Sequence, residues 1–190
     1  MAIKTIAIIP ARKGSKRVPG KNTKVLGSKK LIEYTIEHAI NSRLIDKVVI
    51  NTDDTSIKDI ACQYDCEFYE RDSKLAEDKT STKDVILDFI NKQFIQGSLP
   101  QNIVLLQPTV PFRRAELIDE TIQKLQQGDY DSVTTHIEVD FYHPNRLKVI
   151  KGDYLQPYKD KEDESCNRDD LEKVYCRDGS VYAFKTSSFI

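Results

Sequence analysis

The sequence predicts a three-layer α/β domain, with a mostly parallel β-sheet covered by helices on both faces. Short β-branched, apolar runs alternate along the chain with longer segments whose apolar residues recur at helical spacing. The connections between these runs have the length that crossover units need, so neighbouring strands should run parallel. The 190 residues fit a single domain, 1–190.

The first half of the chain supplies three strands and two helices. Apolar, β-branched runs predict strands at Ile3–Ile9 and Lys47–Thr52. Between them, apolar residues at helical spacing predict an amphipathic helix at Lys30–Ser42. After the second strand, we expect Thr55 to cap a helix that ends near Gln63, followed by a brief strand at Glu67–Tyr69.

The second half continues the alternation. Ser81 or Thr82 should cap a helix whose apolar stripe is core: Val85, Ile86, Phe89, Ile90 and Phe94. A strand at Asn102–Leu106, a helix at Ala115–Gln126 and a strand at Ser132–Ile137 follow. The last strand, Ser180–Lys185, should return to the sheet.

The alternation lapses beyond Ile137. The segment His143–Tyr158 predicts a β-ribbon with its turn at Gly152-Asp153, and the charged segment after it predicts a loop. An antiparallel excursion from a parallel sheet is commonly a lid or a dimer contact, and the residues alone leave both interpretations open.

Composition excludes several classes. A net charge of −1 argues against general nucleic-acid binding. No apolar run approaches the ~18 residues of a membrane span, and the start of the chain lacks the apolar length of a signal peptide, so we expect a cytoplasmic protein without a membrane role. The spacings of the four cysteines match no zinc template.

The stretch Ile6–Asn22, IAIIPARKGSKRVPGKN, carries the strongest functional signal. A buried strand runs directly into a basic loop that contains glycines and no acid, and nine of the 29 Lys and Arg residues lie before residue 33. In an open α/β sheet, ligands bind at the carboxyl ends of the strands, so the pattern indicates a phosphate site. A solvated basic face is the alternative.

The residue types in this loop suit phosphoryl or nucleotidyl transfer. Gly14 and Gly20 let the backbone approach a polyphosphate, while Arg12, Lys16 and Lys21 supply positive charge. A Walker loop is not indicated, because five residues separate the two glycines and Asn22 follows the lysine. A GxGxxG dinucleotide motif is also absent.

The loop ARKGSKRVPGKN resembles the signature of the acylneuraminate cytidylyltransferase family, which makes CMP-activated nonulosonic acids. Five further matches follow in order: NTDD from residue 51, LAEDKTST from 75, LLQPTVPFR from 105, HP at 143 and RDDLEKVYCRDGSVYAF from 168. The resemblance implies a Rossmann-like nucleotidyltransferase fold, a homodimer formed through an inserted ribbon at 140–158, and Mg²⁺ as cofactor. It further implies that CTP and a 2-keto sugar acid give a CMP-sugar and pyrophosphate.

The resemblance also implies roles for individual residues. The triphosphate contacts are expected from the first loop: Ala11, Arg12, Gly14, Ser15, Lys16, Lys21 and Asn22, with Arg12, Lys16 and Lys21 catalytic. Thr80 and Thr82 would hold cytosine, with Arg71 close by. Gln107 and Arg168 would face the sugar acid; the alternatives are that Gln107 is only a turn residue after a strand and that Arg168 is a solvated side chain of a charged loop.

Two departures from the family pattern affect the substrate and the metal. The family's sugar-contacting Asn-Gly pair is Asp178-Gly179 here, so sialic, legionaminic and pseudaminic acids all stay open. The expected Mg²⁺ carboxylates would lie beyond Ile190, so we expect a truncated chain, or substitution by Asp53 or Asp54. A CTP-binding form without catalysis and a ketodeoxyoctonate cytidylyltransferase are the alternatives.

Overall fold

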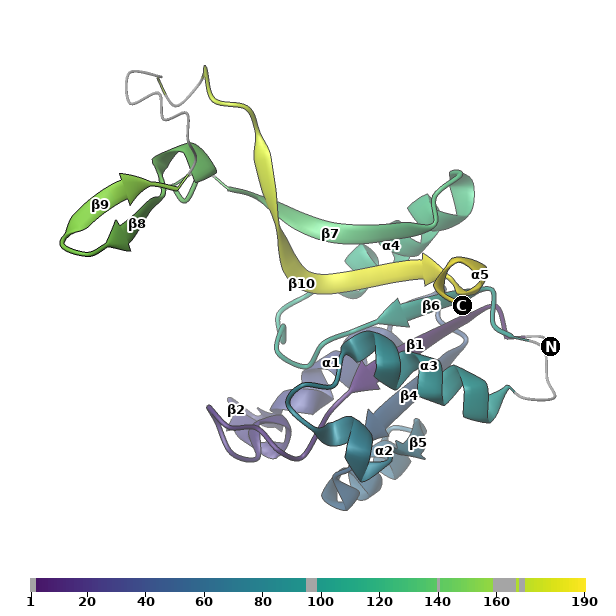
Figure 1. The fold of residues 1–190 in the computed structure, drawn as a ribbon. Helices are drawn as coiled ribbons and strands as arrows, with labels where there is room; N and C mark the ends of the chain where they lie inside the picture. Colours follow the sequence, from purple (N-terminus) through teal and green to yellow (C-terminus); the bar gives the residue numbers. More distant parts are fainter. Residues whose placement is uncertain (1–2, 95–98, 140, 159–166, 168–169) are drawn as a thin grey trace. The chain divides into compact units, whose positions relative to one another are not determined.

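The computed structural model describes residues 3–94, 99–139, 141–158, 167 and 170–190 (Figure 1). The chain divides into two compact units. The first comprises residues 1–135 and 179–190, and the second residues 136–178. The sequence predicted a single domain with a ribbon at 140–158. The second unit contains that ribbon and includes further residues before and after it.

A six-stranded sheet organises the first unit, in the order β5-β4-β1-β6-β10-β7. Its strands are β1 (Thr5–Pro10), β4 (Lys47–Thr52), β5 (Glu67–Glu70), β6 (Asn102–Leu105), β7 (Ser132–Val139) and β10 (Val174–Lys185). β1 pairs in parallel with β4 and β6, and β4 pairs in parallel with β5. β10 is antiparallel to β6. The predicted mostly parallel sheet is therefore confirmed.

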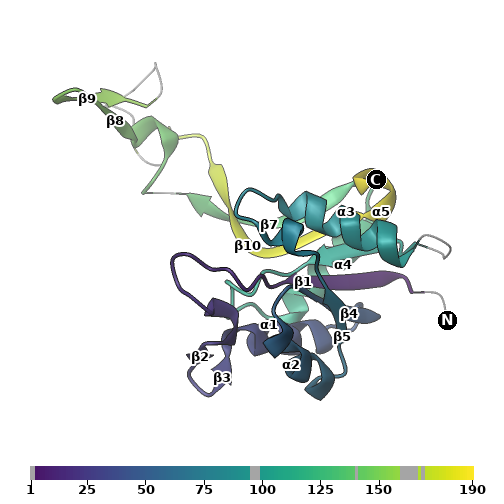
Figure 2. The same cartoon turned by 60° about the horizontal axis from the view of Figure 1, so that its bottom comes forward.

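Helices cover both faces of this sheet, because side chains alternate along each strand. Ile9 and its neighbours on one face pack against α1 (Leu31–Ile40), α2 (Lys58–Gln63) and α4 (Ala115–Gln127). Ile8 and its neighbours on the other face pack against α3 (Thr82–Gln93) and the short α5 (Thr186–Phe189). Figure 2 shows α3 and α5 on one side of the sheet and α1 and α2 on the other. The three-layer prediction is confirmed.

The helix starts confirm one predicted cap and correct another. The hydroxyl of Ser81 accepts a hydrogen bond from the backbone N–H of Asp84, so Ser81 caps α3. The prediction that Thr55 caps the helix after β4 is wrong. The carboxylate of Asp54 accepts from Ser56 N at 3.1 Å and caps a 3₁₀ turn, η2 (Thr55–Ile57), which leads into α2. A carboxylate before the turn caps it as well as a hydroxyl does.

The second unit contains the predicted ribbon. A short turn, η4 (Pro144–Arg146), precedes β8 (Lys148–Lys151), which pairs antiparallel with β9 (Tyr154–Pro157). The turn between them has Gly152 at φ 62°, a left-handed conformation that glycine tolerates. His143 is buried and links two segments of this unit, because its Nε2 lies 2.9 Å from the carbonyl of Glu172. Within the described ranges, we find no helix long and apolar enough to cross a membrane.

Candidate active site

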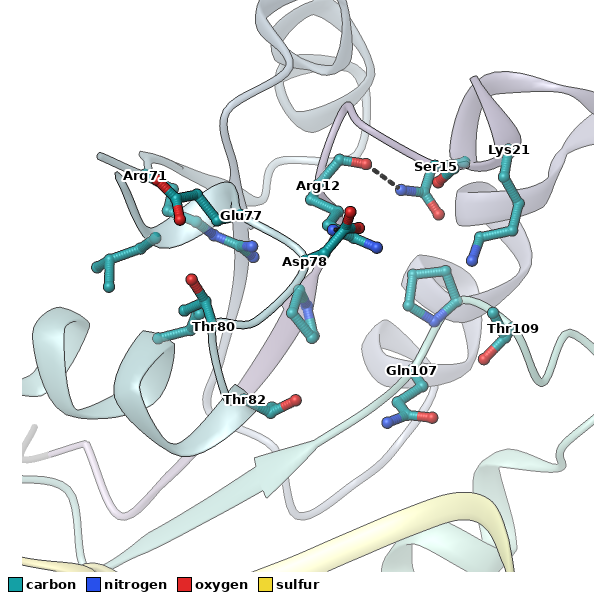
Figure 3. Close-up of a pocket in the computed structure, with 15 residues that line it drawn as sticks. Arg12, Ser15, Lys21, Arg71, Glu77, Asp78, Thr80, Thr82, Gln107 and Thr109 are labelled. Carbon is teal, nitrogen blue, oxygen red and sulfur yellow. Dashed lines mark hydrogen bonds and ion pairs between the residues drawn. The ribbon is translucent and has the colours of Figure 1, made fainter. Parts of the chain in front are cut away.

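A cavity of about 330 Å³ lies where the carboxyl ends of β1 and β6 meet the start of α3, a volume typical of small-molecule sites. Its wall brings together most of the predicted site residues: Arg12, Ser15, Lys21, Asn22, Arg71, Thr80, Thr82 and Gln107. Figure 3 shows Thr80 and Thr82 on one side, Lys21 and Thr109 on the other, and Arg12 with Asp78 between them. These residues lie as much as 95 positions apart in the sequence.

The basic loop is held by the strands beside it. The carboxylate of Asp53, at the end of β4, accepts a hydrogen bond from the Lys13 backbone N–H at 2.8 Å. Asn22 closes the other end, since its Nδ2 donates to the carbonyl of Arg12 at 3.1 Å. The side chain of Asp53 thus anchors the basic loop, and that of Asp54 caps the turn. From the sequence, metal binding was the alternative role for both.

Arg12 and Lys16 share one acidic partner. Arg12 Nη1 lies 2.7 Å from Asp78 Oδ1, and Lys16 Nζ pairs with Asp78 Oδ2. The hydrogen bonds from Lys16 and Arg12 hold the pKa of the Asp78 carboxyl below its usual value. Lys16 and Gly14 line an adjoining hollow together with Arg12, Ser15 and Asp78. Arg12 and Lys16, which the sequence predicted to bind phosphate, are therefore paired with a carboxylate of the same chain.

Arg71 is a buried cation in the wall of the cavity. Its Nε donates to Asn51 Oδ1 and its Nη2 donates to the Asn51 carbonyl, both at 2.7 Å. Burial lowers the pKa of this guanidinium, the charge of nearby Asp53 raises it, and the charge of Arg12 lowers it. Because two bonds fix the plane of the guanidinium, Arg71 presents its charge to the cavity from a rigid position.

The other predicted residues have varied positions. Gln107 follows β6, lines the cavity, and its carbonyl accepts a hydrogen bond from Arg113. Ala11 is fully buried in the core, and both its backbone groups bond to the end of β4, so it positions the loop and does not face the cavity. Asp178 is a partly exposed residue of β10 in the second unit. Arg168 lies outside the described residues.

A model of the cytidylyltransferase family matches residues 6–190, nearly the whole chain. This chain belongs to the cytidylyltransferase family. The cavity suits a cytidylyltransferase, because it presents the cations Arg12, Lys21 and Arg71 beside polar groups such as Thr80, Thr82 and Gln107.

Known relatives of this cytidylyltransferase act on several related sugar acids. The chain is 31% identical to the CMP-N,N'-diacetyllegionaminic acid synthase of Legionella pneumophila, over 99% of this chain and 78% of the relative. It is 30% identical to the pseudaminic acid cytidylyltransferase of Campylobacter jejuni, over 97% of this chain and 79% of the relative. The N-acylneuraminate cytidylyltransferase of Streptococcus agalactiae is 29% identical, over 99% of this chain and 45% of the relative.

Solved structures agree at the level of the fold. A CMP-2-keto-3-deoxy-manno-octonic acid synthetase, solved with CTP, superposes with a TM-score of 0.73 at 19% identity, covering 98% of this chain and 76% of that one. The 4-diphosphocytidyl-2C-methyl-D-erythritol synthase of Anaerococcus prevotii gives 0.64 at 21% identity, covering 97% and 71%. The cytidylyltransferase therefore has the Rossmann-like nucleotidyltransferase fold that the sequence predicted.

The sequence analysis did not predict the acidic residues in the wall of the cytidylyltransferase cavity. Glu77 and Asp78 follow a 3₁₀ turn, η3 (Ser73–Ala76), and both line the cavity. One signal in the sequence could have predicted them: the acids of LAEDKTST stand directly before α3, at the same edge of the sheet as the acid-free basic loop. That placement puts acids and cations at the same end of the sheet.

The two loop glycines should respond differently to alanine. Gly20 has φ 63°, so Gly20→Ala imposes left-handed strain of ~1–2 kcal/mol and should lower the free energy of unfolding by about that amount. Gly14 has no positive φ, and an added Cβ would meet no atom within 4 Å, so Gly14→Ala should leave stability unchanged. Urea unfolding measures both variants, and equal losses would contradict this difference.

Proposed function

We propose that this protein is a CTP-dependent cytidylyltransferase that activates a nonulosonic acid, giving a CMP-sugar and pyrophosphate. The observation that carries the proposal is the convergence of Arg12 and Lys21 with Thr80, Thr82 and Gln107 in one cavity at the carboxyl end of the sheet. The sequence similarity to enzymes that make CMP-linked nonulosonic acids supports the same reaction.

We propose one orientation for the nucleotide in this cavity. Cytosine lies towards Thr80 and Thr82, whose hydroxyls can exchange hydrogen bonds with the polar edge of the base. The triphosphate then runs over the basic loop, where Arg12, Ser15 and Lys21 meet its oxygens and Lys16 meets the outer phosphates. Asn22 acts through the loop, because its side chain fixes the carbonyl of Arg12.

The reaction is a single displacement at phosphorus. The anomeric hydroxyl oxygen of the sugar acid forms a bond to the α-phosphorus of CTP, and the bond from that phosphorus to the β-bridging oxygen breaks. Pyrophosphate leaves, and the hydroxyl proton passes to solvent. Negative charge grows on the phosphoryl oxygens, so Arg12 and Lys21 stabilise the transition state more than the ground state.

From the family resemblance, we propose that Gln107, Arg168 and Asp178 contact the sugar acid and that Arg168 pairs with its carboxylate. Asp178 supplies a carboxylate where the family resemblance has an amide, so it accepts hydrogen bonds but donates none when ionised. Because relatives of this chain act on legionaminic, pseudaminic and N-acylneuraminic acids, we propose the nonulosonic class as a whole. A ketodeoxyoctonate substrate is the runner-up.

Magnesium stays a prediction from the resemblance. Among the residues that the structure describes, no group of three or more His, Cys, Asp and Glu side chains is placed to hold a metal ion. Of the acids in the cavity wall, Asp78 is already paired with two cations. Activity titrated with Mg²⁺ and with a chelator tests this prediction.

We also propose a homodimer formed through the second unit. An apolar groove there is lined by Ile137, Phe141, Tyr142, Val174 and Tyr175, among others. Phe141 is 80% exposed and Tyr142 78%, and contiguous apolar surface of this kind marks interaction sites. Nucleic acid and membranes are not proposed as partners, and the cytoplasmic location expected from the sequence remains a prediction for fractionation to test.

Light scattering tests the dimer. The expected mass is about twice the 21.8 kDa of one chain, since burial of the exposed aromatic residues drives association. Phe141→Glu should shift the protein to monomer, because it places a charge in an apolar contact. A monomeric unsubstituted protein would contradict the proposal.

The enzymatic proposal is tested by pyrophosphate release. The protein is mixed with CTP and, in separate reactions, with N-acetylneuraminic, legionaminic, pseudaminic and ketodeoxyoctonic acids. Release with one of the first three supports the proposal, and release with ketodeoxyoctonic acid alone supports the runner-up. Calorimetric binding of CTP without turnover on any sugar acid would instead support a CTP-binding protein without catalysis.

A further inference from the structure

A single carboxylate holds two of the cations that the proposed function assigns to phosphate. Asp78 Oδ1 lies 2.7 Å from Arg12 Nη1, and Asp78 Oδ2 pairs with Lys16 Nζ. Arg12 Nη1 also lies 3.5 Å from the carbonyl of Ala76, at the base of the same turn. The two carboxylate oxygens of Asp78 thus occupy donors in the way that two phosphoryl oxygens would.

The Asp78 carboxylate is exposed, so another anion can displace it from Arg12 and Lys16. The Asp78 side chain is 37% exposed and that of Lys16 is 82% exposed, so water competes for both ends of the ion pair. Asp78 lies in a short exposed turn, in which Thr80 N donates to the carbonyl of Glu77. By contrast, Arg71 is buried and fixed by two bonds to Asn51. The cavity and the adjoining hollow therefore combine one buried, fixed cation with two cations whose carboxylate partner is exposed.

We propose that Asp78 is an internal competitor for the triphosphate: it occupies Arg12 and Lys16 in the nucleotide-free protein and is displaced when phosphates bind. This inference rests on the proposed function, because it assumes that phosphates bind to this loop. Asp78 keeps the two cations over the cavity in the absence of ligand. It also competes with pyrophosphate for them after the reaction, which weakens the hold on the product.

The lowered pKa of the Asp78 carboxyl has the same cause, the hydrogen bonds from Lys16 and Arg12. Glu77 provides a matched comparison. It lines the same wall, one residue earlier, and among the described residues its carboxylate takes part in no ion pair. Substitution of either acid removes one negative charge from the wall, but only Asp78→Asn releases Arg12 and Lys16.

The test is calorimetric titration of the full chain with inorganic pyrophosphate and, separately, with CTP. We expect Asp78→Asn to bind pyrophosphate about three- to tenfold more tightly than the unsubstituted protein, since two exposed ion pairs no longer compete. Glu77→Gln should change the affinity less than about twofold, through long-range charge alone. Asp78→Ala should match Asp78→Asn, and circular dichroism checks that each variant is folded.

Two results would overturn the inference: equal or weaker binding by Asp78→Asn, or an equal gain in Glu77→Gln and Asp78→Asn. The first would mean that Asp78 does not compete, and the second that only the net charge of the wall matters. Failure of the proposed function looks different: either the unsubstituted protein binds neither CTP nor pyrophosphate, or it binds CTP and turns over none of the sugar acids.

Discussion

Substitution of Lys21 by alanine should lower kcat for CMP-sugar formation about 10²–10³-fold, with a smaller effect on the KM for CTP. Lys21 lines the cavity at the start of η1 (Lys21–Thr23), a turn that Gly20 opens in a left-handed conformation. Its backbone N–H donates to the carbonyl of Val18 at 3.1 Å, which fixes the direction of the residue. In the proposed reaction the ammonium group stabilises the charge that develops on the α-phosphate and pyrophosphate, so its loss should slow the chemical step.

Lys24→Ala is the matched control for this prediction. Lys24 lies two residues beyond the basic loop and carries the same charge, but it is exposed and is not among the residues that line the cavity. Steady-state kinetics of both variants separates a local effect from a general loss of positive charge. If Lys24→Ala were as impaired as Lys21→Ala, or if Lys21→Ala kept full activity, the assignment of Lys21 would be wrong.

Replacement of Arg71 by alanine should damage both stability and nucleotide binding. The substitution leaves Asn51 Oδ1 buried without its donor, at a cost of ~1–3 kcal/mol in the free energy of unfolding, while the Asn51 carbonyl keeps the hydrogen bond from the backbone N–H of Ala11. It also removes a fixed cation from the cavity, so the KM for CTP should rise at least about tenfold. Arg71→Lys should recover little, because an ammonium cannot reproduce the two bonds of the guanidinium plane.

The control for Arg71 is Arg43→Ala, which removes an exposed guanidinium outside the cavity. It should change the free energy of unfolding by less than ~0.5 kcal/mol and leave CTP binding unchanged. Chemical denaturation and calorimetry with CTP measure both effects. Normal stability and normal CTP affinity of Arg71→Ala would show that the bonds to Asn51 organise nothing in the site.

Much of the fold follows from local pattern. The run KVVINT predicted β4 at its observed bounds, because β-branched residues that are buried on both faces leave an unbroken signal. The small hairpin of β2 (Val25–Leu26) and β3 (Lys29–Lys30) was missed, because two-residue strands carry no periodicity. β10 was predicted too short, since its first half bears exposed residues such as Tyr175 and lacks the apolar signal of a core strand.

The site was predictable where chemistry and position coincide in one stretch of sequence. The basic loop follows a buried strand, so Arg12 and Lys21 could be placed at the carboxyl edge of the sheet from sequence alone. Asp78 could not be paired with Arg12, because the two are 66 positions apart and only the fold brings them together. The contact of Ala11 with the nucleotide was implied by the family resemblance, and its burial in the core next to β1 is what the structure adds.

The most direct test of the central claim follows the phosphorus atoms of CTP. CTP labelled at the α-phosphorus is mixed with the protein and a nonulosonic acid, and a parallel reaction uses CTP labelled at the γ-phosphorus. A cytidylyltransferase places the α-label in the sugar product and the γ-label in pyrophosphate. Transfer of the γ-label to the sugar acid, or no transfer of either label with any nonulosonic acid, would contradict the function proposed for this cavity.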